Sequence, residues 1–141
     1  MTSFTSRYGN PADDYRGAHI WTHCRHSTTV VAVAGTVDSA NIGHIGEHVG
    51  RFVDSGTPLV LDLSGVTMCT PDALGLFDAI DQHCAQAGVR WALVAGDPVT
   101  RHLGGGAEYP VAGSVTEAEQ RFDDAILARR RGLLPLFAKS A

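Results

Sequence analysis

The stretch LVLDLSGVTMCTPDALGLF (residues 59–77) joins an apolar strand to the start of a helix. Its first five residues, 59–63, are almost all apolar, which is typical of a strand covered on both faces. Residues 70–72, Thr-Pro-Asp, then form a helix-start signal, because a hydroxyl residue suits the N-cap, proline the first helical position and an acidic residue the first turn. We therefore expect a strand over 59–63 and a helix over about 72–87.

The chain beyond this helix supplies a second apolar strand. The helix has one apolar face, made of Ala73, Leu76, Phe77, Ile80, Cys84 and Ala87. Gly88 follows where a left-handed residue commonly ends a helix, and the apolar run VRWALVAG occupies 89–96. Strand, helix and strand form a βαβ unit, which predicts a right-handed crossover between parallel strands.

Two strands are also expected upstream of the opening stretch. Residues 18–26 (AHIWTHCRH) alternate roughly, as in an edge strand, and residues 27–35 (STTVVAVAG) are β-branched and apolar. The two segments can form a hairpin that turns near residues 26–27.

A loop and a helix separate that hairpin from the opening stretch. In the loop, residues 35–41, the side chain of Asp38, Ser39 or Asn41 can cap the next helix. Apolar residues recur at helical spacing over 42–53. Three glycines in this helix each cost about 1 kcal/mol relative to alanine, which fits either close packing against a neighbour or a mobile helix.

The last part of the chain adds a short strand and a helix. Residues 97–108 have room for one helical turn before three consecutive glycines, and residues 109–113 can supply a short edge strand. Residues 114–131 are expected to form a helix, opened by the capping box of Ser114 and Glu117.

The resulting fold class is α/β, with the order β-β-α-β-α-β-(α)-β-α and a small mixed sheet packed with about four helices. Three segments are expected: a flexible N-terminal arm over 1–17, one domain over 18–131 and a C-terminal tail over 132–141. The apolar residues of the tail could dock on the domain or on a partner, so a homodimer is open.

Composition excludes several classes of function. The chain has 141 residues, 44% hydrophobic residues and a net charge of −4, which gives no basic surface for nucleic acid. No segment approaches the roughly 20 apolar residues of a membrane helix, so membrane insertion is not expected. The N-terminus has no apolar signal region, and three cysteines without C-x-x-C spacing fit a reduced, cytoplasmic protein.

Motifs for metals, cofactors and catalysis are weak. His44 and His48 are four residues apart on a predicted helix, but no third ligand is indicated, so we expect no metal. No phosphate-binding or dinucleotide-binding glycine motif occurs, and we expect no cofactor. Cys69 precedes a helix N-terminus, where the pKa of a thiol can fall, so a thiol enzyme is one alternative, although no local motif supplies a base.

Taken together, these segments resemble the STAS domain family, which includes anti-sigma factor antagonists. The family motif is a strand ending in Asp-Leu-Ser, a short turn, and Asp-Ser-Ser-Gly-Leu opening a helix. The matching residues here are Asp62, Leu63, Ser64, Val66, Thr67, Leu74 and Gly75, with Gly35, Val37 and Asp38 matching an upstream G-x-L-D pattern. The resemblance covers about residues 18–128.

One part of the motif departs from the family pattern. Asp-Ser-Ser-Gly becomes Thr70, Pro71, Asp72 and Ala73. In switched family members the first serine accepts phosphate from an anti-sigma kinase, and Pro71 at that position cannot. Thr70 is the remaining possible phosphoacceptor. Helix initiation alone accounts for the same residues, so this alternative stays open.

The resemblance implies a non-enzymatic interaction module that binds an anti-sigma factor of the histidine-kinase-like ATPase type and so regulates transcription. The partner-binding residues it implies are Asp38, Thr67, Thr70, Pro71, Asp72 and Leu74. The altered motif implies action without the usual serine phosphorylation. Alternatives are a STAS-like subunit of a transporter ATPase and a small-ligand sensor.

Overall fold

The structure, a computed structural model, describes residues 12–103 and 109–140, with side chains described over 13–103 and 109–128. The elements in chain order are β1 (Ala12–Tyr15), β2 (Ala18–Arg25), β3 (Thr28–Val37), α1 (Ile42–Val53), β4 (Leu59–Cys69), α2 (Ala73–Ala87), β5 (Trp91–Ala95), α3 (Asp97–Thr100), β6 (Val111–Ala112) and α4 (Val115–Ser140).

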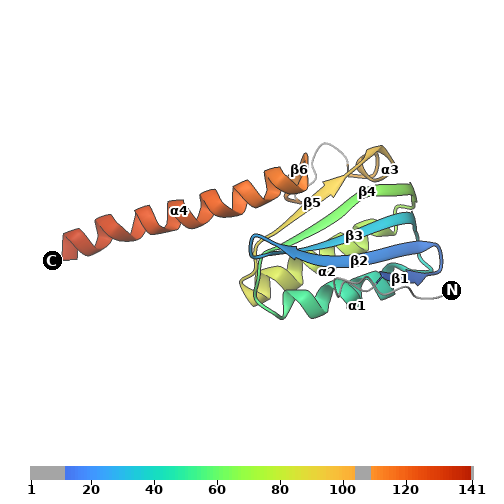
Figure 1. The fold of residues 1–141 in the computed structure, drawn as a ribbon, viewed down its shortest axis with the longest axis horizontal. Coiled ribbons are helices and arrows are strands. Elements are labelled where there is room, and N and C mark those ends of the chain that lie inside the picture. Colours follow the sequence, from blue (N-terminus) through green and yellow to red (C-terminus); the bar gives the residue numbers. More distant parts are fainter. Residues whose placement is uncertain (1–11, 104–108, 141) are drawn as a thin grey trace.

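These strands form one mixed sheet in the order β1-β2-β3-β4-β5-β6 (Figure 1). The pairs β1–β2 and β2–β3 are antiparallel, and the pairs from β3 to β6 are parallel. The predicted α/β class, the mixed sheet and the parallel pairing across α2 are confirmed.

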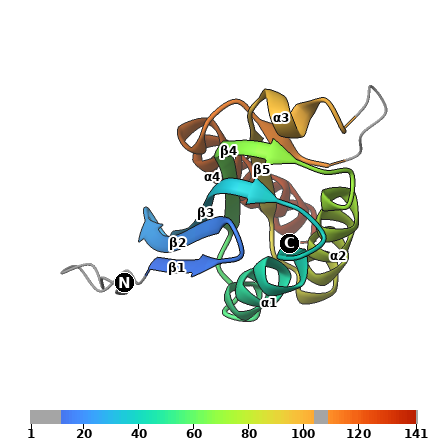
Figure 2. The ribbon, with the colours of Figure 1, turned by 90° about the vertical axis from the view of Figure 1, so that its right-hand side faces the viewer.

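Helices cover the sheet on two sides. The main core lies between the sheet and the α1–α2 pair, which lie together on one side (Figure 2). Phe77 of α2 and Ile45 of α1 are completely buried there. A second, smaller core on the opposite face joins Val60 and Val94 to Ala118 and Phe122 of α4.

The β2–β3 hairpin turns at the position that the sequence predicts. His26 and Ser27 have φ angles of 51° and 65°. Two successive left-handed residues make the tight turn whose twist matches that of paired strands.

The N-terminal part of the sheet differs from the sequence prediction. Residues 12–15, assigned to the flexible arm, form β1 and pair with β2. Therefore β2 is not the edge strand. The sequence signal for a strand is weak here because ADDY contains no β-branched residue. Contacts with neighbouring elements hold the strand in place. The carboxylate of Asp13 lies 2.5 Å from Nε2 of His44 in α1, and the ring of Tyr15 stacks on the same imidazole. The rest of the predicted arm, residues 1–11, lies outside the described residues.

Strand β4 is longer than the predicted 59–63, since it continues to Cys69. Its pairing with β3 shifts register on either side of the Ala34–Gly35 step. Gly35 has a φ of 91°, and a Cβ there would lie 2.4 Å from the carbonyl oxygen of Gly17. The irregular register lets SGVTMC, a segment of mixed polarity, remain in the ladder, which an apolar-periodicity argument cannot detect.

Helix α4 begins as predicted but does not end near residue 131. The hydroxyl of Ser114 accepts a hydrogen bond from the amide of Glu117 at 3.0 Å. The Glu117 carboxylate accepts one from the amide of Gly113, one residue before the position expected for a capping box. The helix continues to Ser140, so residues 132–140 of the predicted tail are helical.

Candidate functional site

The predicted partner-binding residues gather at one edge of the sheet. Because β3 and β4 are parallel, their carboxyl ends meet, and the amide of Thr70 donates to the carbonyl of Val37 at 3.0 Å. The loop after β3 therefore lies beside the turn after β4. We call residues 38–41, 67–72 and 74 the carboxyl-edge surface.

The loop after β3 is held by Asn41, which is completely buried. Its side-chain amide donates to the carbonyls of Arg16 and Thr36, at 3.1 and 2.9 Å, and its oxygen accepts from the amide of Asp38. Asn41 occupies the N-cap position of α1 without making a capping bond. It joins the loop after β3 to the β1–β2 turn at Arg16, a role that the capping prediction missed.

The turn 70–72 differs from the predicted cap arrangement. Asp72, not Thr70, is the N-cap of α2, and its side chain makes no capping bond. The amides of Ala73 and Leu74 donate to the carbonyls of Thr70 and Pro71, which makes a tight turn ahead of the helix. The Thr70 hydroxyl donates to the Asp72 carboxylate at 3.1 Å, so it is directed at an acid instead of at the helix amides.

Exposure separates the predicted residues into two groups. Thr67, Pro71 and Asp72 are exposed, whereas Asp38, Thr70 and Leu74 are only partly exposed, with Leu74 packed against the main core. The Thr67 hydroxyl donates to the carbonyl of Gly35 at 3.2 Å.

Met68 belongs to this surface, although it was not among the predicted residues. Its side chain is 52% exposed between Thr67 and the buried Cys69. A large apolar side chain on a polar surface is typical of an interaction anchor. The sequence GVTMC shows the methionine, but its exposure can be inferred only when the register of the strand is known.

The turn after α3 and the chain just before β6 contact the segment that joins β4 to α2. The Nε2 atom of His102 lies 2.7 Å from the carbonyl oxygen of Cys69. The Tyr109 hydroxyl donates to the carboxylate of Asp78 and to the carbonyl of Leu74, the latter at 3.4 Å. The turn between β4 and α2 is thus fixed by contacts from later in the chain.

The thiol of Cys69 is poorly placed for nucleophilic catalysis. The residue is 9% exposed, and burial raises the pKa of its thiol. The sulfur contacts the carbonyl of Thr70, while the imidazole of His102 bonds to the Cys69 carbonyl and not to the sulfur. A protonated thiol without a positioned base is a weak nucleophile.

The histidines of α1 have structural contacts. The ring of His48 is buried, with Nε2 lying 2.8 Å from the Thr22 hydroxyl, and burial, with Arg51 nearby, lowers its pKa. Within the described part of the chain, no three His, Cys, Asp or Glu residues come together as metal ligands. No helix in the same part is both long and apolar enough to span a membrane.

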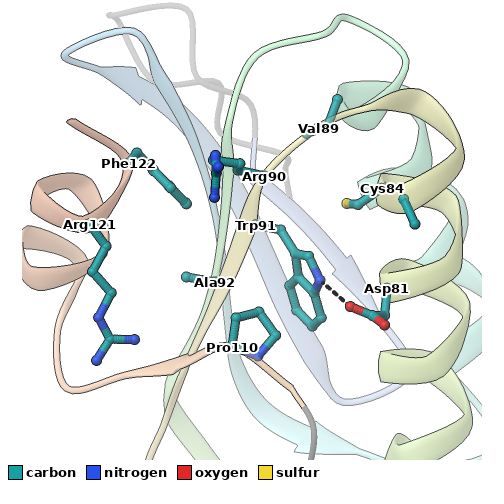
Figure 3. A pocket seen from close by; sticks show the side chains of 10 residues that line it. Asp81, Cys84, Val89, Arg90, Trp91, Ala92, Pro110, Arg121 and Phe122 are labelled. Carbon is teal, nitrogen blue, oxygen red and sulfur yellow. Dashed lines mark hydrogen bonds between the residues drawn. The ribbon is translucent and has the colours of Figure 1, made fainter. Parts of the chain in front are cut away.

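A groove lies at the other end of β5, between α2 and α4 (Figure 3). Its volume is about 390 Å³. Asp81 accepts a hydrogen bond from the Trp91 indole at 2.9 Å, and Arg121 donates to the Val111 carbonyl and to Glu117. Asp81 and Arg121, two of the charged side chains that line the groove, are thus hydrogen-bonded to other residues of the chain.

Known proteins match both the sequence and this architecture. The sequence profile of the STAS domain family matches residues 19–105, from β2 past α3. Osmosensory protein A of Mycobacterium tuberculosis is 42% identical over an alignment of 146 positions, which covers 99% of this chain and 92% of that protein. An anti-sigma factor antagonist from Mycobacterium paratuberculosis has a TM-score of 0.61 at 25% identity, covering 80% of this chain and 94% of that structure.

A more distant structure shares the fold alone. It is an RsbS variant from Moorella thermoacetica, with a TM-score of 0.61 at 17% identity, covering 78% of this chain and 97% of that one. The profile match spans more than half of the chain and agrees with the motif residues at the end of β4. The protein belongs to the STAS domain family.

Proposed function

We propose that this protein is a non-enzymatic, cytoplasmic antagonist that binds an anti-sigma factor through the carboxyl-edge surface and so releases a sigma factor for transcription. The partner we propose is an anti-sigma factor of the histidine-kinase-like ATPase type. The likeness to an anti-sigma factor antagonist at 25% identity supports this class.

The observation that carries the proposal is the exposed Pro71–Asp72 pair at the point where family members carry the switch serine. Proline has no hydroxyl to phosphorylate. Asp72 places a carboxylate at the N-terminus of α2 at all times, where the helix dipole favours negative charge. We infer that the surface has one fixed state instead of two states separated by phosphorylation.

The environment of Thr70 supports the same inference. Its hydroxyl already donates to the Asp72 carboxylate, and its side chain is partly buried. A phosphate on Thr70 would add nearly two negative charges next to that carboxylate. The repulsion would oppose the tight turn 70–72, so we propose that Thr70 is a structural residue and not a phosphoacceptor.

Affinity measurements test the partner-binding surface. With a purified anti-sigma ATPase domain, Met68→Ala removes an exposed apolar anchor, and we expect at least tenfold weaker binding by isothermal titration calorimetry. Asp72→Asn removes the fixed charge and should weaken binding to a smaller extent. The matched control is Asp124→Asn on the exposed side of α4, which should bind like the parent protein.

Two results would contradict the proposal. Phosphosite mapping after incubation with candidate anti-sigma kinases would contradict the fixed-state mechanism if it found phosphate on Thr70. Capture of a transporter ATPase from lysate, with loss of capture by Met68→Ala, would replace the sigma-factor pathway with the transporter alternative. The small-ligand sensor is the remaining alternative, and dialysis against labelled metabolite pools would detect a bound ligand.

The name of the 42% identical relative adds a physiological context. We propose that the protein acts in a response to osmotic conditions. Deletion of its gene should then change the transcripts induced by raised osmolarity, and restoration with the Met68→Ala variant should fail. Unchanged transcripts after deletion would argue against this role while leaving partner binding intact.

A further inference from the structure

The first strand of the sheet is held mainly by polar contacts. β1 has four residues and lies at one end of the strand order, paired with β2. Its described side chains, Asp13, Asp14 and Tyr15, are partly or fully exposed, and none of them belongs to either hydrophobic core. A segment with so little buried apolar surface opens at a lower free energy than the centre of a fold. We call residues 12–17, which comprise β1 and the turn that follows it, the N-terminal strap.

One histidine of α1 attaches the strap to the helical layer. Nε2 of His44 lies 2.5 Å from the Asp13 carboxylate, and the ring of Tyr15 stacks on the same imidazole with 4.0 Å between ring centroids. Figure 2 shows β1 next to α1 at this end of the sheet. Asp14, which points to the other side of the strand, bonds to His19 of β2. That bond lies within the hairpin, so the contacts of His44 are the ones that reach the helix.

The turn of the strap docks on the loop after β3. The carbonyl of Arg16 accepts a hydrogen bond from the Asn41 side chain at 3.1 Å, and the carbonyl of Gly17 accepts one from the Thr36 amide at 2.9 Å. Gly35 permits this close approach, because a Cβ there would lie 2.4 Å from the Gly17 carbonyl oxygen. The turn therefore presents two carbonyl oxygens to the end of β3 and to the loop.

Asn41 extends this contact to the carboxyl-edge surface. Its side chain is completely buried, and its oxygen accepts a hydrogen bond from the amide of Asp38 at 3.1 Å. If the strap departs, the buried Asn41 nitrogen loses the Arg16 carbonyl, and a buried donor without a partner is unfavourable. Attachment of the strap thus favours the present position of Asn41 and, through it, of the loop 38–41.

We propose that the N-terminal strap is a detachable element that sets the position of loop 38–41, with Asn41 as the positioning residue, so that strap attachment and partner binding at the carboxyl-edge surface favour each other. The inference rests on the proposed function for the identity of the partner, whereas the coupling between strap and loop is a property of the free chain. Because such coupling is reciprocal, a bound partner should also hold the strap in place.

Amide hydrogen exchange of the free protein, resolved by residue with NMR, tests the coupling. His44→Ala removes both contacts of the strap with α1, at a partly buried helix position that alanine suits. The amides that pair β1 with β2 should then exchange at least about tenfold faster. The Asp38 amide, which is bonded to Asn41, should also exchange faster, while the amides of β4 and β5 keep their rates.

The matched control is His83→Ala in α2. It removes the bond of a helix histidine to Asp54, just beyond the far end of α1, and should leave both sets of amides at the parent rates. Faster exchange in β1 with an unchanged Asp38 amide would overturn the proposal, because strap and loop would be independent. Unchanged exchange in β1 would overturn it too, since His44 would not attach the strap.

Binding measurements test the consequence for the partner surface. In isothermal titration calorimetry with the anti-sigma ATPase domain, His44→Ala should bind at least about fivefold more weakly than the parent protein. His83→Ala should bind like the parent. The bound domain should slow amide exchange in β1 of the parent protein, because the coupling acts in both directions.

The outcomes separate this inference from the proposed function. If the parent and His44→Ala bind equally well, the strap does not act on the partner surface, and the inference fails while the proposed function stands. If the domain does not bind the parent protein, the proposed function fails, and exchange in the free chain still decides whether the strap positions the loop.

Discussion

The three cysteines differ sharply at the scale of single residues. Cys24 is exposed on β2, whereas Cys69 and Cys84 are buried. Burial, with Asp81 nearby, raises the pKa of the Cys84 thiol to about 11, and burial alone raises that of Cys69. The helix-terminus argument for a reactive Cys69 therefore fails, since desolvation of the thiolate acts in the opposite direction.

Thiol titration at pH 8 should consequently show one fast-reacting cysteine per native chain and three after unfolding. Cys24→Ser should abolish the fast phase, because thiolate content and access both govern the rate. Dithionitrobenzoate absorbance measures both phases. A fast phase that survives Cys24→Ser and disappears in Cys69→Ser would restore the thiol-enzyme alternative.

His48 makes the stability of the fold depend on pH. Its pKa is lowered in the folded state, mainly by burial, so the unfolded chain binds protons more readily than the folded chain below about pH 6.5. The contribution of His48 is complete above that pH and is lost as the pH falls through the folded-state pKa.

Urea unfolding at a series of pH values from 8 to 5 should therefore show falling stability in the parent protein. His48→Gln retains a polar group near Thr22 and should be less stable at pH 8 but show a shallower decline below pH 6.5. Parallel curves for the two proteins would mean that groups other than His48 cause the pH dependence.

At the scale of elements, α1 illustrates how glycines serve packing. A Cβ at Gly46 would lie 3.3 Å from Cδ1 of Leu76, and one at Gly50 would lie 3.4 Å from His83, both in α2. At Gly43 nothing lies within 4 Å of such a Cβ. The glycines that sequence analysis counted as equal costs thus have different roles.

This difference gives a matched pair of substitutions in one helix. Gly43→Ala should stabilise the protein by about 0.4–1 kcal/mol, because it reduces the entropy of the unfolded chain. Gly46→Ala should give a smaller gain or a loss, because the end of Leu76 must move. Chemical denaturation measures both free energies of unfolding, and equal gains would mean that α1 and α2 are more loosely packed than the structure indicates.

Another element-scale contact explains how α4 starts. The Ser114 hydroxyl caps the amide of Glu117, and Glu117 is itself bonded to Arg121 one turn later. Ser114→Ala should cost about 1 kcal/mol of stability, measured by thermal or urea unfolding. Ser114→Asp should restore most of it, since a carboxylate caps equally well, and failure of this rescue would place the loss elsewhere than in the cap.

At the scale of the whole molecule, one ion pair ties the start of the sheet to the last helix. Nε of Arg25 in β2 donates to the Glu119 carboxylate of α4 at 2.8 Å, across 94 positions of sequence. The side chain of Glu119 is 10% exposed, and the side chain of Arg25 is 41% exposed. This contact holds α4 over the hairpin end of the sheet.

A double-mutant cycle measures this long-range contact. Arg25→Ala, Glu119→Gln and the double variant should give a coupling energy of about 1 kcal/mol in urea unfolding, since half of the pair is solvated. Raised salt should reduce it only partly, because the carboxylate is buried. No coupling would mean that other contacts, such as the packing of Ala118 and Phe122, hold α4 in place.

The sequence by itself determined the order of elements from β2 onward, the parallel βαβ unit and the family, because these depend on local periodicity, on turn residues and on the motif from Asp62 to Gly75. The candidate partner-surface residues from Thr67 to Leu74 also come from the sequence, and their role in binding stays a prediction. These features are encoded within short windows, where apolar spacing and backbone preferences act without help from the rest of the chain.

Only the tertiary structure decided the features that depend on contacts distant in sequence. Residues 12–15 form a strand because they pair with β2 and because Asp13 bonds to His44. Strand β4 reaches Cys69 because its irregular register with β3 accommodates a segment of mixed polarity. The side chain of Asn41 donates hydrogen bonds to the carbonyls of Arg16 and Thr36 and does not cap α1. In each case a hydrogen-bonding or packing partner from elsewhere in the chain outweighs local preferences worth about 1 kcal/mol or less, and a window of sequence does not contain that partner.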